Sequence, residues 1–81
     1  MNRLKKNRIY QVNPNYPKSE EKDELLYWMG FERGEIFYIL NIIEIKMDFY
    51  DLNCLNKFGM FEFGLSEYGL ENDDSMFIEI E

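Results

Sequence analysis

EIFYILNIIEIKMDFYDLNCL, residues 35–55, is the stretch that decides the fold, because it is dense in β-branched and aromatic side chains. From Ile43 onward, apolar and polar residues alternate, as they do on a strand with one buried face. After Phe49 the alternation changes phase, which indicates a turn or a bulge near residues 47–50. The pattern therefore predicts two antiparallel strands, at roughly 35–47 and 49–55.

Upstream of this stretch the sequence predicts one strand and one helix. Arg8 to Val12 alternates like a short strand. Ser19 is a good N-cap, acids crowd the turns that follow it, and Gly30 is placed to end the helix. Residues 19–29 thus predict a helix with one apolar end, and we expect that end to pack on the sheet because so short a helix is marginal alone.

Downstream, the sequence predicts two short strands around one helical turn. Met60 to Phe63 follows a turn at 56–59 and predicts a strand that ends at Gly64. Residues 65–71 predict one helical turn that stops at Gly69. The closing strand alternates, with three apolar residues expected on one face: Met76, Ile78 and Ile80.

Together these elements predict a single domain, residues 1–81, that is mainly β (α+β) in class. Five short strands in so short a chain favour a small five-stranded antiparallel barrel or bent sheet, with one short helix inserted at about 19–29.

The sequence GMFEFGLSEYGLE, residues 59–71, resembles the C-terminal part of small Src-homology-3-like barrel proteins of bacteria and phages. In those barrels a strand ends in a single turn that reads roughly Leu-Ser-Glu-x-x-Leu-Glu. Residues 34–40, GEIFYIL, are similar to their first long core strand. The resemblance covers about half of the chain, and residues 13–30 would be an insertion. It implies the Src-homology-3-like fold and no specific activity.

The composition argues against an enzyme. The chain has no His, which removes His-based acid–base catalysis and nearly all zinc and haem sites. The apolar surroundings of Cys54, the single cysteine, would raise its thiol pKa rather than activate it. Asp73 and Asp74 are more readily explained as a solvated acidic loop than as a cation site. We therefore expect no catalytic residues, no cofactor and no metal.

The charges are sorted along the chain. Residues 1–18 hold five cations and no acid, whereas residues 19–81 hold all sixteen acids against four cations, a balance of −12. After Phe58 no cation follows. Such a body repels nucleic acid and attracts basic protein surfaces. The plainer explanation is that a net charge of −7 keeps a small protein soluble.

From this imbalance we draw the hypothesis of a small, acidic, non-enzymatic binding protein. It would be a phage-encoded inhibitor that imitates DNA and occupies the basic surface of a host nucleic-acid-binding enzyme or defence system, as anti-CRISPR and anti-restriction proteins do. It would bind no nucleic acid and no membrane itself. Its predicted partner-binding residues are acids and interleaved aromatics of the C-terminal third: Glu62, Glu67, Tyr68, Glu71, Asp73, Asp74, Phe77 and Glu79.

Two alternatives stay open. Residues 1–7 could form a flexible basic arm through which an accessory domain binds RNA or DNA. Exposed edge strands could instead pair into a homodimer or a larger structural or ligand-sequestering assembly. The lone cysteine and the lack of a long apolar run favour the cytoplasm, which would be the host cytoplasm for a phage protein.

Overall fold

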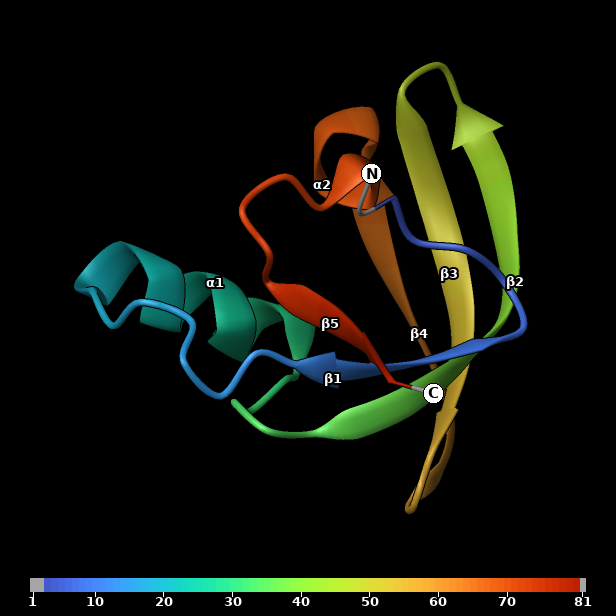
Figure 1. Ribbon diagram of the computed structural model, residues 1–81. Coiled ribbons are helices and arrows are strands. Elements are labelled where there is room, and N and C mark those ends of the chain that lie inside the picture. The colour runs from blue at the N-terminus through green and yellow to red at the C-terminus, as the bar shows by residue number, and fades with distance from the viewer. Residues whose placement is uncertain (1–2, 81) are drawn as a thin grey trace.

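Five antiparallel strands form one bent sheet in the computed structural model, which describes residues 3–80 (Figure 1). The order across the sheet is β4-β3-β2-β1-β5. Helix α1 is inserted between β1 and β2, and the short α2 joins β4 to β5. The fold class predicted from the sequence is confirmed. The elements are β1 (Arg8–Val12), α1 (Glu20–Met29), β2 (Ile36–Lys46), β3 (Phe49–Asn56), β4 (Gly59–Ser66), α2 (Glu67–Glu71) and β5 (Phe77–Ile80).

The change of phase in the deciding stretch is a two-residue hairpin turn. Lys46 pairs with Phe49, so Met47 and Asp48 form the turn between β2 and β3. Asp48 has a φ of 64°, the left-handed conformation that tight hairpin turns require. The two predicted strands are therefore confirmed almost to the residue.

A cluster of phenylalanine rings fills the space inside the bent sheet. Phe31, which follows α1, lies with its ring centroid 4.9–5.8 Å from those of four other phenylalanines. Most of these contacts are edge-to-face, a geometry that adds roughly 0.5–1.5 kcal/mol per pair beyond area burial. Phe31 thus ties the end of α1 to the core. Its four ring partners are Phe37, Phe61, Phe63 and Phe77.

Two glycines do not end elements as predicted. Strand β4 continues through Gly64 to Ser66, and a Cβ at Gly64 would lie 2.6 Å from Cζ of Phe49. This glycine is required for the close approach of that ring, not for a chain break. Helix α2 likewise runs past Gly69 and ends at Asn72, whose φ of 58° provides the left-handed cap.

Strand β5 has the opposite facing from the one predicted. Phe77 pairs with Val12 of β1 and is buried with it, whereas Ile78 is 40% exposed. The alternation alone could not decide which set faces inward, because both sets contain large apolar residues.

Helix α1 has the predicted ends, and only part of its apolar end packs on the core. Ser19 Oγ accepts a hydrogen bond from the Lys22 amide, and Gly30, with a φ of 81°, caps the C-terminus. We expected the apolar end to pack on the sheet. Leu26 does lie in the core and Met29 is partly buried against it, whereas the rest of the apolar run is exposed and the helix projects from the side of the sheet (Figure 1).

The basic N-terminal segment is docked at residues 3–7 rather than extended as a free arm. Leu4 is buried, and its amide donates to the carbonyl of Leu70 in α2. The Asn7 amide donates to the carbonyl of Ile39 in β2. Residues 1–2 of the predicted arm lie outside the described residues. Within the described part of the chain, no helix is long and apolar enough to cross a membrane.

Candidate partner-binding surface

The N-terminal arginines neutralise half of the predicted acidic residues. Arg3 donates hydrogen bonds from its guanidinium to both Glu67 and Glu71 of α2. Arg8 pairs with Glu79 of β5 at 2.9 Å. The three carboxylates therefore keep their negative charge but face an internal cation, which reduces what they can offer to a partner.

Glu67 is the most strongly held of these acids. The hydrogen bond from Arg3, together with one from the Tyr50 hydroxyl at 2.8 Å, lowers the pKa of the Glu67 carboxyl to about 2. The same contact raises the pKa of Arg3. Glu67 thus acts as a structural acceptor that fixes the N-terminal segment on α2.

The other predicted residues are dispersed. Phe77 belongs to the core and does not lie on the surface. Glu62 is exposed on β4, and Asp73 is exposed in the loop after α2. Asp74 is exposed as well, although it accepts a hydrogen bond from the Tyr16 hydroxyl at 2.8 Å. Burial, together with that contact, raises the pKa of Tyr16 to about 12. The predicted residues therefore do not form a single acidic surface.

A groove between the two helices offers a better defined surface, which we call the helix groove. One hollow of about 280 Å³ lies where Leu25 and Met29 of α1 face Tyr68 of α2. A second hollow, of about 450 Å³, opens beside it under Trp28. Leu25, Tyr68 and Asp74 line both hollows, so the two are adjacent. Two of the predicted residues, Tyr68 and Asp74, thus come together here.

The helix groove has exposed aromatic walls. Trp28 is 74% exposed, and the neighbouring Tyr27 is 77% exposed and lies edge-to-face against it, with ring centroids 5.8 Å apart. Tyr68 on the facing helix is 73% exposed. Aromatic side chains left open to water beside a hollow are the residue types that dominate protein–protein binding energy.

Acidic side chains surround these aromatics. Glu21 and Glu24 of α1 line the hollow under Trp28, together with Asp74. Within residues 3–80, neither Glu21 nor Glu24 makes an ion pair, in contrast to Asp23, which pairs with Arg33 at 2.6 Å. Lys22 lines the same hollow but lies against Tyr16, with Nζ 3.4 Å from its hydroxyl, so the helix groove combines apolar walls with three acids and one cation.

A run of apolar residues in the sequence indicates this exposed surface, although we expected the run to pack on the sheet. Residues 25–29 are five consecutive apolar residues in a helix of only ten. A helix buries one face, so five neighbours in a row cannot all be covered. The run therefore implied that some of its large side chains would face solvent.

Cys54 lies in the core, and burial raises the pKa of its thiol to about 12, which confirms the expectation of an unreactive cysteine. Within the described chain, no three Asp, Glu or Cys side chains are grouped closely enough to hold a metal ion.

Comparison with known proteins assigns no family to this chain. No family model matches the sequence, and neither a curated protein nor a solved structure shows significant similarity to it. The Src-homology-3-like relationship stays a prediction, and the function must be argued from the helix groove itself.

Proposed function

We propose that this chain is a small non-enzymatic binding protein that holds a basic segment of a partner protein in the helix groove. The observation that carries the proposal is the juxtaposition of Trp28 and Tyr68, both largely exposed, with the unpaired acids Glu21 and Glu24. The exposed acids alone are explained by solubility, and the exposed aromatics alone by chance. Together they form a site of defined chemistry.

A lysine or arginine side chain matches both the apolar walls and the carboxylates of the helix groove. Its methylene stem can pack on apolar walls such as Leu25, while its charged head reaches the carboxylates. A cation over an aromatic face gains about 0.5–2 kcal/mol, depending on how far it is desolvated. The net charge of −7 also speeds the approach of a positively charged partner.

We propose a nucleic-acid-binding enzyme as the partner class, because such proteins carry the most extensive basic surfaces. A basic segment held in the helix groove would be withheld from the enzyme's own nucleic acid, which is an inhibitory arrangement. This version does not require an extended imitation of a phosphate backbone. That requirement is harder to meet, since Arg3 and Arg8 neutralise three of the acids it would use.

Direct nucleic-acid binding through the N-terminal segment has less support. Arg3 and Arg8, two of its cations, are engaged with acids of the same chain. Phosphate contacts would have to break those ion pairs and approach an acidic body.

The test is capture of partners from a bacterial lysate, followed by titration of the purified partner. We expect the captured protein to be basic, and we expect Trp28→Ser to weaken its binding at least about thirtyfold, the loss typical of an aromatic hot spot. The double variant Glu21→Gln, Glu24→Gln should weaken it too, and more so at low salt.

The matched control is Phe58→Ser, which removes a similarly exposed aromatic outside the helix groove. It should bind the partner as the wild type does. If Trp28→Ser binds equally well, or if the chain binds a DNA duplex at physiological salt, the proposed function is wrong.

A further inference from the structure

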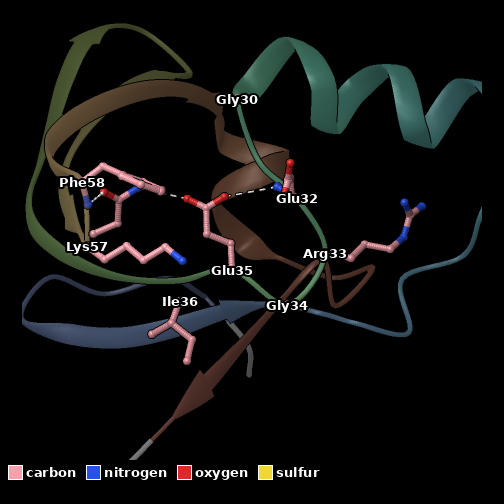
Figure 2. A pocket seen from close by; sticks show the side chains of 9 residues that line it. Gly30, Glu32, Arg33, Gly34, Glu35, Ile36, Lys57 and Phe58 are labelled. Carbon is pink, nitrogen blue, oxygen red and sulfur yellow. Dashed lines mark hydrogen bonds between the residues drawn. The ribbon is translucent and has the colours of Figure 1, made fainter.

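A second surface lies around the β3–β4 turn, where Phe58 is 85% exposed. Beside it is an open hollow of about 600 Å³ between this turn and the loop that follows α1. Figure 2 shows Glu35 pointing into this hollow, while Arg33 points away from it. The lining residues used below are Glu32, Glu35, Ile36, Asn56, Lys57 and Phe58.

The turn that presents Phe58 is held in place by hydrogen bonds. The Phe58 amide donates to Asn56 Oδ1 at 2.8 Å, and Asn56 Nδ2 donates to the Glu35 carboxylate at 3.0 Å. Glu35 also accepts from the Glu32 amide at 3.2 Å, so both sides of the hollow are connected (Figure 2). An exposed aromatic on a pre-organised turn loses little conformational freedom when it binds.

The sheet next to this turn exposes apolar side chains on its outer face. Leu55 pairs with Met60 on β4 and with Tyr38 on β2, which places these residues on the same face as Ile36. Ile36 is 52% exposed, Leu55 is 41% exposed and Met60 is 75% exposed. The face therefore offers a continuous apolar region beside Phe58.

We propose that two copies of this chain associate through this face, each inserting Phe58 into the other's hollow. A two-fold axis makes such a contact reciprocal and closed. It would also bring Lys57 of each copy near Glu32 of the other, and both side chains are exposed. A protein of net charge −7 repels itself over most of its surface, so a contact that pairs its own cation with its own acid is favoured.

The size of the face agrees with a dimer contact. Taking roughly 200 Å² for a fully exposed large side chain, and the four apolar residues as 41–85% exposed, they present together on the order of 500 Å². A standard interface buries ~800 Å² per partner, of which a little over half is apolar. The four residues are Ile36, Leu55, Phe58 and Met60.

Sedimentation equilibrium from micromolar to millimolar protein tests the proposal. We expect a monomer–dimer equilibrium that persists at high salt, because the contact is mainly apolar. Phe58→Ser should weaken dimerisation at least about thirtyfold. Tyr27→Ser, which removes an equally exposed aromatic on α1, should leave it unchanged.

Exchanging the two charged residues of the proposed contact is a second test of the dimer. Lys57→Glu alone and Glu32→Lys alone should each weaken the dimer, and the two changes together should restore it to within about threefold of the wild type. A chain that stays monomeric at millimolar concentration overturns the proposal. A dimer that is unaffected by Phe58→Ser, or that the exchange fails to restore, overturns it equally.

Discussion

The two helices look alike in the sequence but differ in the folded protein. Each begins after a capping serine, carries at least one acid in its first turn and buries a single leucine, Leu26 in α1 and Leu70 in α2. The acids of α2 form ion pairs with Arg3, whereas within the described chain Glu21 and Glu24 of α1 form none, although Lys22 lines the same hollow. The difference shows that acidity counted along a sequence is not acidity available at a surface.

The route of the N-terminal segment causes this difference. Leu4 is hydrogen-bonded to α2, and Arg8 lies on β1 next to Glu79 of β5. The most basic part of the sequence is thus folded onto its most acidic third, so the sorting of charge along the chain is partly cancelled in space. Helix α1, inserted between β1 and β2, lies outside this cancellation.

The largest expected effect comes from breaking the connection between α1 and the core. Phe31→Ala removes a buried ring that contacts four other phenylalanine rings. Loss of such a ring costs about 3–5 kcal/mol. Urea denaturation should show this decrease in the free energy of unfolding, whereas Tyr27→Ala, at an exposed site, should change it by less than about 0.5 kcal/mol. A small effect of Phe31→Ala would mean that the rings are not a cooperative core.

The next largest effect should differ between the two helices. Leu70→Ala should lower the global free energy of unfolding by about 2–5 kcal/mol, because Leu70 is buried and α2 packs against β3 and β4. Leu26→Ala should act mainly on α1, which then opens locally.

Amide hydrogen exchange distinguishes these outcomes. Faster exchange confined to residues 20–29 in Leu26→Ala supports an independently opening α1. Uniformly faster exchange across the sheet in that variant would show that α1 is as integral to the fold as α2.

A smaller effect is a pH dependence that arises at Glu67 of α2. The pKa of Glu67 is about 2 in the folded chain, below its ordinary value of 4.5. The folded state therefore binds this proton less readily than the unfolded state does. The stabilisation is fully present above about pH 4.5 and is lost as the pH falls towards 2.

Urea midpoints measured between these pH values should fall for the wild type and fall less steeply for Glu67→Gln. Glu62→Gln, at an exposed carboxylate, should keep the wild-type slope. Parallel slopes in Glu67→Gln and the wild type would show that Arg3 does not hold this carboxylate in solution.

The sequence predicted those parts of the fold that depend on residues close to one another in the chain. The strands of the deciding stretch, their turn at Met47 and Asp48, and both ends of α1 followed from alternation, capping and turn chemistry. What the sequence could not supply depends on partners far along the chain. Gly64 is explained only by the ring of Phe49, and the facing of Phe77 only by its register with Val12.

The residues of the candidate site show the same difference between what nearby sequence predicts and what distant partners decide. Asp74 and Tyr68 were identified as exposed partner residues, but Arg3 lies 64 residues from the Glu67 that it neutralises. No charge pattern along the chain indicates such a pair. The aromatics of α1 were visible as a run, yet their exposure depends on how little of the helix the sheet covers.

The smallest effect comes from the two capping serines. Ser19 Oγ accepts from the Lys22 amide at 3.1 Å, and Ser66 Oγ accepts from the Gly69 amide at 3.2 Å. Replacing either by alanine should cost its helix about 1 kcal/mol, and replacing either by aspartate should restore the cap.

The two losses of stability should nevertheless appear in different measurements. Ser66→Ala should lower the global urea midpoint, because Leu70 and Arg3 couple α2 to the rest of the protein. Ser19→Ala should leave that midpoint nearly unchanged and speed amide exchange in residues 20–29. Equal shifts of the global midpoint in both variants would contradict the comparison. They would mean that α1, despite its exposed aromatics, folds and unfolds with the sheet.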